Sequence, residues 1–163
     1  MKTMRRKDRQ MSAEWALEVF DRAPFITVGM TQPDGTPYAL PLSLVRAADN
    51  VFYFHCAAEG EKIDCLRSQP CVSLSAVSYC SPEYIADRHN FTMYYDSAMA
   101  FGRAEFVTDN AEKMLALRLL CRRFLPEYME HFAPAAERSV SHTTVVKITL
   151  TAPPTGKNHS ALR

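Results

Sequence analysis

The sequence lacks the features that mark nucleic-acid-binding and membrane proteins. Neither sign of charge is in excess, because 19 Lys and Arg residues face 18 Asp and Glu residues. Without a strong positive field, neither nucleic acid nor an anionic membrane surface is an expected partner. No apolar run approaches the roughly 20 residues that span a bilayer, and no apolar segment of signal-peptide length follows the basic residues 1–9. We therefore expect a cytoplasmic protein.

The chain also lacks the spacings of common metal and nucleotide sites. Its cysteines are odd in number and form no Cys-x-x-Cys pair, which argues against a zinc cage or a disulfide framework. We interpret them as buried, reduced thiols, and we expect no metal. No Gly-x-Gly-x-x-Gly motif is present, so a nicotinamide cofactor would have to bind transiently, without a Rossmann site. The cysteines are Cys56, Cys65, Cys71, Cys80 and Cys121.

What is present is the composition of a globular protein. Of the 163 residues, 47% are hydrophobic and 23% are charged, which fits a single domain over residues 1–163 with one sizeable core. Ser12 can cap a helix that ends at Arg22, because its apolar residues recur at helical spacing. Strands are then predicted at residues 25–30, 36–46 and 51–56, separated by turn-forming residues. Prolines at positions 37 and 41 place the second strand at a sheet edge or bulge.

The second half mixes helices and strands in the same way. A short helix is expected to begin near residue 61 and to stop at Gln69-Pro70, and Asp109 to Glu112 resembles a capping box for a further helix. Residues 81–96 have no clear period and are predicted to form a long loop. The remaining predicted elements are strands at 72–77, 97–107 and 143–150, a basic N-terminal arm at 1–11 and an irregular tail at 151–163. Five or six mostly antiparallel strands with peripheral helices indicate a small α+β barrel.

The segment from His55 to Lys62 is the most informative for function. Small residues there allow a ligand to approach the backbone, and a helix beginning at Glu61 presents unpaired N–H groups beside the Lys62 ammonium. Such an arrangement can bind a phosphate group. The same pattern also describes an ordinary turn followed by a helix with an exposed lysine, and both interpretations are open at this point.

Six motifs occur in an order that resembles the pyridoxamine 5′-phosphate oxidase-like flavoproteins, and specifically their 5-nitroimidazole resistance branch. The resemblance covers nearly the whole chain, and it implies a homodimeric, six-stranded antiparallel split β-barrel that holds FMN where two protomers meet. The motifs are Met4-Arg5-Arg6-Lys7-Asp8-Arg9, Asp34-Gly35-x-Pro37-Tyr38, Pro41-Leu42-Ser43, the segment from His55 to Lys62, Phe101-Gly102-Arg103-Ala104 and Thr155-Gly156-Lys157.

The resemblance also implies which residues contact the cofactor. One group would border the isoalloxazine ring, a second would lie near the ribityl phosphate, and a third would approach from the other protomer or close over the ring. In that order the groups are Pro41, Leu42 and Ser43; His55, Cys56, Ala57 and Lys62; and a third group in which Ser97 and Met99 approach from the other protomer while Thr155, Gly156 and Lys157 close over the ring.

Single residues remain open to two interpretations. His55 is the candidate catalytic residue, because an imidazole can supply a proton near neutral pH, but it can equally be a structural residue at a strand end. The N-terminal Arg5, Arg6 and Arg9 either contact a flavin phosphate or partner subunit, or form a solvated basic arm. The other histidines lack ligand spacing and are interpreted as surface residues; they are His89, His131, His142 and His159.

Three functions are compatible with these observations. The first is an FMN-dependent oxidoreductase that takes electrons from NADH or NADPH and reduces a small acceptor, such as a nitroimidazole or another nitroaromatic. The second is a non-catalytic module that stores or senses flavin or haem. The third is pyridoxamine 5′-phosphate oxidation itself, which the resemblance to the nitroimidazole branch makes the least favoured.

Overall fold

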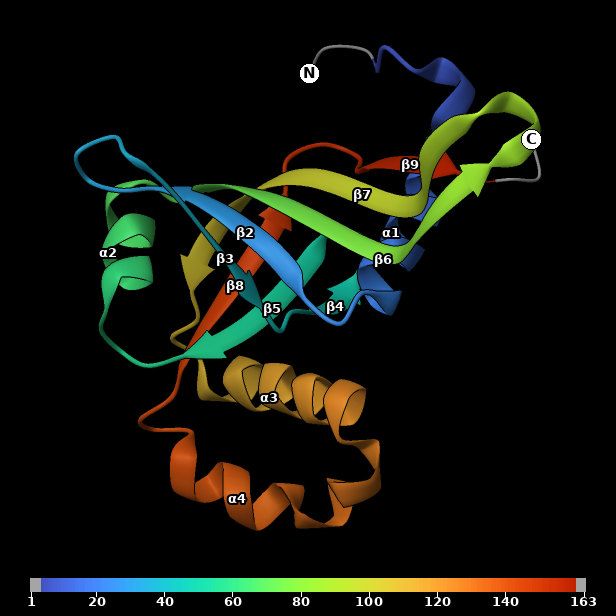
Figure 1. The fold of residues 1–163 in the computed structure, drawn as a ribbon. Coiled ribbons are helices and arrows are strands. Elements are labelled where there is room, and N and C mark those ends of the chain that lie inside the picture. Colours follow the sequence, from blue (N-terminus) through green and yellow to red (C-terminus); the bar gives the residue numbers. More distant parts are fainter. Residues whose placement is uncertain (1–3, 161–163) are drawn as a thin grey trace.

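The structure, a computed structural model, describes residues 4–160 and is built around one antiparallel sheet (Figure 1). Within the described residues the sheet has nine strands, and four α-helices and three 3-10 turns lie around it. The strands are β1 (Gln10–Met11), β2 (Ile26–Thr31), β3 (Pro37–Leu42), β4 (Val45–Ala48), β5 (Val51–Cys56), β6 (Cys71–Ile85), β7 (Asn90–Phe106), β8 (Thr144–Leu150) and β9 (Thr155–His159). The helices are α1 (Ala13–Arg22), α2 (Glu61–Ser68), α3 (Asn110–Phe124) and α4 (Phe132–Ser139), and the turns are η1 (Lys7–Arg9), η2 (Ala86–Arg88) and η3 (Pro126–His131).

The strand order is β3-β2-β6-β7-β8-β5-β4, and every pairing is antiparallel. Strand β9 pairs with β1 and with β7, so β7 carries β8 along residues 102–106 and β9 along residues 95–99. The expected α+β barrel with peripheral helices is confirmed, but the expected number of six strands is too small. The predicted strand at 36–46 is two strands, because the chain bends after β3 and β4 pairs with β5 instead of β2.

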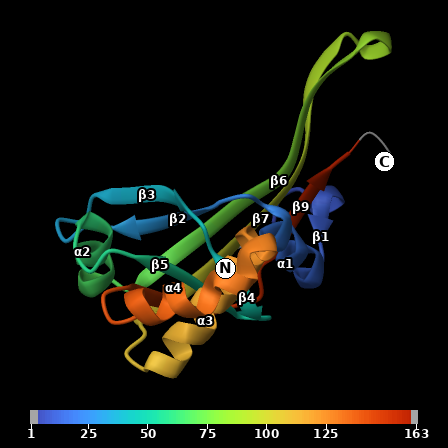
Figure 2. The same ribbon diagram turned by 90° about the horizontal axis from the view of Figure 1, so that it is seen from below.

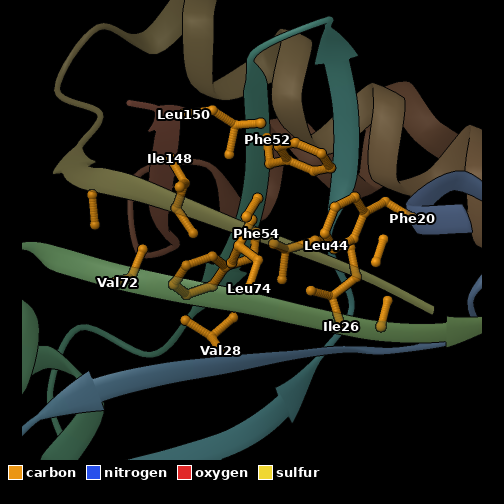
Figure 3. Close-up of a cluster of buried hydrophobic side chains, with 14 of the residues drawn as sticks. Phe20, Ile26, Val28, Leu44, Phe52, Phe54, Val72, Leu74, Ile148 and Leu150 are labelled. Carbon is orange, nitrogen blue, oxygen red and sulfur yellow. The ribbon is translucent and has the colours of Figure 1, made fainter. Parts of the chain in front are cut away.

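The interior of the barrel is filled by large apolar side chains that alternate along the strands (Figure 3). Phe52 and Phe54 point inward from β5, and Phe52 meets Phe20 of α1 edge-on with ring centroids 5.5 Å apart. Ser12 caps α1 by accepting a hydrogen bond from the Trp15 backbone N–H, as its sequence predicts. This cap and the apolar face of α1 fix the helix across one end of the barrel.

A second apolar cluster lies between the sheet and the pair of helices α3 and α4. Tyr53 and Val145 project from β5 and β8 toward Leu117 and Leu120 of α3. Because neighbouring residues of a strand face opposite ways, β5 divides its side chains between the barrel interior and this helical layer. The Asp109 carboxylate accepts a hydrogen bond from the Glu112 backbone N–H, which confirms the predicted cap of α3.

Residues 81–96 are not the predicted loop. They belong to a long hairpin in which β6 and β7 stay paired from Tyr79–Asp96 out to Ile85–Asn90, and it projects from the barrel (Figure 2). Beyond the barrel neither face of a strand is buried, so the sequence there has no apolar alternation. The pattern used to find strands is therefore absent although the backbone is a strand.

The predicted irregular tail is correct for residues 151–154 but wrong for residues 155–159, which form β9. Gly156 explains how this strand fits: a Cβ built there would lie 2.7 Å from Cε3 of Trp15, so only glycine lets β9 approach α1 this closely. The prediction that prolines keep β3 at a sheet edge is confirmed, since β3 pairs only with β2 within the described residues. Residues 1–3 and 161–163 of the arm and the tail lie outside the described part of the chain.

Candidate functional site

The segment that connects β5 to α2 places backbone N–H groups where they can bind an anion. Gly60 occupies the N-cap position with a φ of 115°, and no side chain caps the helix. The Ile63 N–H donates to the Gly60 carbonyl at 2.8 Å. The Glu61 and Lys62 N–H groups, however, lack a side-chain acceptor, and their partial positive charge is available to a phosphate. Ala57, which the resemblance assigns to the cofactor, lies exposed in this connection. The sequence-based interpretation of this segment as a turn and helix start is thus supported by the backbone itself.

Lys62 adds a full positive charge to this helix end. Its side chain is half-buried, and within residues 4–160 it forms no ion pair with a carboxylate. The neighbouring Glu61 carboxylate is engaged elsewhere, because it accepts a hydrogen bond of 2.6 Å from the Gln32 amide on the β2–β3 turn. An anion that binds at this end would meet an ammonium group without a competing carboxylate partner.

Cys56 lies close enough to Lys62 for their charges to interact. Burial raises the pKa of the Cys56 thiol, and the nearby Lys62 ammonium offsets only part of that effect. The thiol is therefore protonated at neutral pH and behaves as an apolar, weakly donating wall of the site. It packs against the barrel core from the end of β5. We name Gly60, Cys56 and Lys62 the α2 half-site.

His55 faces away from the α2 half-site. The alternation along β5 turns Cys56 toward the barrel core and His55 toward a cavity between α3 and α4. Sequence reasoning treated the two residues as one cluster, because adjacency in the chain says nothing of the side on which each residue lies. The structure thus gives His55 surroundings different from those of Lys62.

The predicted ring-binding residues Pro41, Leu42 and Ser43 lie at the end of edge strand β3. Leu42 packs against the barrel core, Pro41 is exposed on the outer sheet face, and Ser43 is half-buried in the bend that follows. Pro41 is aligned with Met99 through two intervening strands, in a row formed by Pro41, Thr27, Ser75 and Met99. Three strand spacings put the two ends of this row about 14 Å apart.

Ser97 and Lys157 meet where β7 pairs with β9. They are direct register partners, and the Ser97 hydroxyl donates to the Lys157 carbonyl at 3.5 Å. The Lys157 ammonium lies 5.3 Å from the centroid of the Tyr95 ring. The structure thus brings together Ser97, which the resemblance assigns to the approach from the other protomer, and Lys157, which it assigns to closing over the ring, 60 positions apart in sequence.

Tyr95 is a candidate residue that the sequence analysis missed. The Arg9 guanidinium donates to its hydroxyl at 3.5 Å. Burial alone would raise the pKa of Tyr95, but hydrogen bonds with Lys157 and Arg9, together with their positive charges, bring it below the usual value of 10.0. A phenol with a lowered pKa between two cations is suited to donate a proton. The residue was missed because its segment was predicted to be a loop.

His159 completes this cluster and is not the solitary surface residue that its sequence context indicates. The Arg9 Nη2 atom lies 2.9 Å from His159 Nε2, and since arginine only donates, Nε2 must accept. The ring proton is then on Nδ1, which donates to the Met93 carbonyl at 2.7 Å. We name Arg9, Tyr95, Lys157 and His159 the β9 half-site.

The remaining N-terminal arginines do not join the β9 half-site in the same way. Arg6 donates to the Asp8 carboxylate at 2.8 Å, and Arg5 is exposed. Burial of the Arg9 side chain leaves its Nε atom without a hydrogen-bond partner among the described residues. Of the three predicted arginines, Arg9 is therefore the one whose position favours ligand binding.

The two half-sites lie at different ends of the same protomer. In both ribbon views α2 is at one end of the barrel and β9 toward the other, with β6 and β7 running between them (Figures 1 and 2). The outer face of these strands carries exposed apolar side chains, since Met99 is 49% and Phe101 is 42% exposed. This geometry keeps the α2 half-site and the β9 half-site apart within one chain.

Comparison with known proteins gives the family. The sequence matches the family model described as pyridoxamine 5′-phosphate oxidase over residues 12–155, which includes the α2 half-site and the Tyr95 strand. No curated protein matches the sequence. Among the described residues, no helix is both long and apolar enough to cross a membrane.

Solved structures share the fold. A proposed 5-nitroimidazole antibiotic resistance protein from Bacteroides thetaiotaomicron aligns with a TM-score of 0.75 and 25% identity, covering 88% of this chain and 82% of that chain. The flavocytochrome Anf3 from Azotobacter vinelandii aligns with a TM-score of 0.80 and 23% identity over 98% of this chain and 73% of its own. The FAD and haem binding protein from Mycobacterium smegmatis aligns with a TM-score of 0.79 and 19% identity, covering 94% of this chain and 74% of that chain.

The two latter structures are evidence for the fold alone, whereas the family model matches the sequence itself over most of its length. Sequence match and architecture agree: the chain belongs to the pyridoxamine 5′-phosphate oxidase family and has its α+β split-barrel fold.

Proposed function

We propose that the protein is an FMN-dependent oxidoreductase that works as a homodimer. Each flavin would lie between the α2 half-site of one protomer and the β9 half-site of its partner. The observation that carries this proposal is that the two half-sites are separated. The α2 half-site can bind an anion at Lys62, and the β9 half-site can donate a proton from Tyr95. A two-fold axis converts such a pair into two complete sites per dimer.

The exposed outer sheet face supports the homodimer. Val77, Met99 and Phe101 lie on neighbouring strands and are each more than 40% exposed. Large apolar side chains gathered in this way favour contact with another protein surface. Because the face lies between the half-sites, a second copy packed on it would bring its own β9 half-site toward the first protomer's α2 half-site.

The residues then have separate tasks. The Lys62 ammonium and the N–H groups of α2 bind the ribityl phosphate, and the neutral Cys56 thiol excludes water beside it. Bound FMN supplies hydride chemistry, with electrons from NADH or NADPH going to a small acceptor such as a nitroimidazole or another nitroaromatic. The Tyr95 phenol holds the proton that the reduced acceptor requires, and Arg9 and Lys157 stabilise the phenolate that remains.

A second candidate is a flavin- or haem-binding module without turnover. This candidate is favoured by the similarity to a flavocytochrome and to an FAD and haem binding protein. The two alignments cover 98% and 94% of this chain. The visible spectrum of the purified protein distinguishes flavin from haem. Oxidation of NADPH that depends on a 5-nitroimidazole distinguishes an enzyme from a binding module, and peroxide formation with pyridoxamine 5′-phosphate would instead indicate the oxidase reaction.

The Lys62→Ala variant tests whether Lys62 binds the phosphate of FMN. One charge-assisted hydrogen bond contributes about 1.5–3 kcal/mol, so the Kd for FMN should rise about 10- to 150-fold. Fluorescence titration of the apoprotein measures this Kd, and Lys113→Ala on α3, also half-buried, is the matched control. An unchanged Kd in Lys62→Ala would remove Lys62 from the site.

Mixed dimers test the shared site. Lys62→Ala and Tyr95→Phe protomers should each form inactive homodimers at limiting FMN, because each lacks one half of every site. After equal mixing, half of the dimers carry one intact site, so about one quarter of wild-type NADPH oxidation should return. No recovery after subunit exchange, shown to be complete by mass spectrometry, would mean that both half-sites serve the same protomer or none.

A further inference from the structure

The pair of helices α3 and α4 encloses a cavity that the proposed flavin site does not use. Its volume is about 430 Å³, within the range of small-molecule sites. Its lining is mostly apolar and comes from α3, η3, α4 and the end of β5. The side chains that matter here are Leu117, Leu125, Tyr128, Ala135 and His55. We name it the helix-pair cavity.

The helix-pair cavity is separated from the α2 half-site by strand β5. His55 lines the cavity, whereas Cys56 packs on the barrel side and interacts with Lys62. A molecule in the cavity therefore has the strand between itself and the proposed flavin phosphate. Hydride transfer needs the reacting atoms about 3–3.5 Å apart, so this cavity is not the acceptor site of the proposed reaction.

The polar groups of the cavity are few, and most are engaged. The Thr143 hydroxyl donates to the Ser139 carbonyl at 2.9 Å, and the Ser139 hydroxyl donates to the Ala135 carbonyl at 3.0 Å. The His55 imidazole forms no hydrogen bond with the described part of the chain, and it can both donate and accept. The Tyr128 hydroxyl also lines the cavity and forms no hydrogen bond with the described residues, so His55 and Tyr128 are the groups that can orient a ligand.

The apolar part of the cavity is incompletely covered. Leu125 is 51% and Tyr128 is 57% exposed, although both line the cavity. The lining contains no Lys, Arg, Asp or Glu side chain among the described residues. A charged ligand would lose its hydration there, and the His131 imidazole of the lining already faces the Glu130 carboxylate at 3.4 Å, so the cavity favours neutral molecules over ions. A neutral molecule loses little and covers the exposed side chains.

We propose that the helix-pair cavity is a second binding site, and that it takes a small neutral aromatic molecule carrying one hydrogen-bonding group. The ring fills the space between Leu117 of α3 and Ala135 of α4. The polar group meets the His55 imidazole. This inference does not depend on the proposed flavin chemistry, because no residue of either half-site lines the cavity.

4-Iodophenol is a suitable probe, because it combines one ring, one hydroxyl and an anomalous scatterer. Crystals soaked in the probe should show the iodine peak between α3 and α4, and calorimetry should give a matching Kd in solution. Iodine found only elsewhere would overturn the proposal. So would binding at crystal concentration only, without a calorimetric signal.

Two variants on one helix make the test specific. Ala135→Trp fills the cavity and should weaken binding of the probe at least about tenfold. Ala133→Trp places the same side chain on an exposed position outside the lining and should leave the Kd within about twofold. Circular dichroism confirms that both fold, and equal affinity of both variants for the probe would overturn the proposal.

His55→Phe tests the polar contact. Removing one neutral hydrogen bond should raise the Kd of the probe about 2- to 13-fold while the FMN affinity stays at the wild-type value. If Ala135→Trp instead changed the sedimentation coefficient, the cavity would be a contact between copies of the chain and not a ligand site. An FMN affinity that fell in parallel with the probe affinity would place His55 in the flavin site and would also contradict the proposal.

Discussion

Replacement of Arg123 tests how strongly its hydrogen bonds hold α3 against the barrel. Its guanidinium leaves the last turn of α3 and donates to four backbone carbonyls: Phe20 at 2.9 Å, Asp21 at 3.0 Å, Ala23 at 2.8 Å and Leu44 at 2.7 Å. Three of these carbonyls belong to the C-terminal end of α1 and the residues after it, where a helix has no N–H donors of its own for the last carbonyls. One side chain thus joins α3, α1 and the bend before β4.

The size of the effect follows from the environment of these bonds. Burial lowers the pKa of Arg123, although the side chain stays charged at any pH at which the protein folds. A hydrogen bond to a charged group contributes about 1.5–3 kcal/mol, but the carbonyl of Asp21 is exposed and water replaces its partner. Because one guanidinium makes all of these bonds, their contributions are not additive, and we expect Arg123→Met to lower the free energy of unfolding by about 2–4 kcal/mol, and the Tm by about 4–16 °C.

Urea and thermal denaturation followed by circular dichroism measure this change. Arg122→Met is the matched control, because Arg122 is exposed on the same helix turn and should alter stability by less than about 0.5 kcal/mol. Arg123→Lys should recover only part of the loss, since one ammonium cannot reach all of these carbonyls on two separate segments. A loss below about 1 kcal/mol in Arg123→Met would refute the reasoning that these bonds are shielded from water.

Two further predictions concern stability. Gly156→Ala should lower the free energy of unfolding by about 1–3 kcal/mol in urea denaturation, because its Cβ would lie 2.7 Å from Trp15, and a neutral result would show that β9 shifts freely. Hydrogen bonds from Tyr53 and Lys147 lower the pKa of Glu112 below its ordinary 4.5, so the stability they provide is complete above that pH and is lost as the pH falls through the folded-state pKa. Glu112→Gln should therefore cost stability at pH 7 and progressively less below pH 4.5, and a difference that does not change with pH would contradict this.

Single residues that mark the start of a helix were enough to predict where α1, α2 and α3 begin. Ser12 and Asp109 cap α1 and α3 as their side chains indicate, and Gly60 marks the start of α2. The core strands were predictable because one face of each is buried, which produces alternation. Where both faces are exposed, as from Tyr79 to Tyr95, the same method found no strand.

The candidate site was predictable only in part. Lys62 was found because a turn, a glycine and a helix start are local features of the chain. Tyr95 was not, since its neighbours Arg9 and Lys157 lie 86 and 62 positions away and meet it only through the pairing of β9 with β7. The side on which His55 lies was likewise beyond the sequence, because it depends on which face of β5 the helices α3 and α4 cover.

The pairing of β5 with β8 has a consequence for how the chain folds. Val51 is the register partner of Thr149, so the barrel closes through residues that are separated by most of the sequence. Contacts of such long range slow folding, because a large loop must be ordered before they form. During synthesis, one edge of β5 has no partner until β8 has left the ribosome. Until then the apolar residues of the core face an open sheet, a state in which exposed apolar surface and unpaired strand edges favour aggregation.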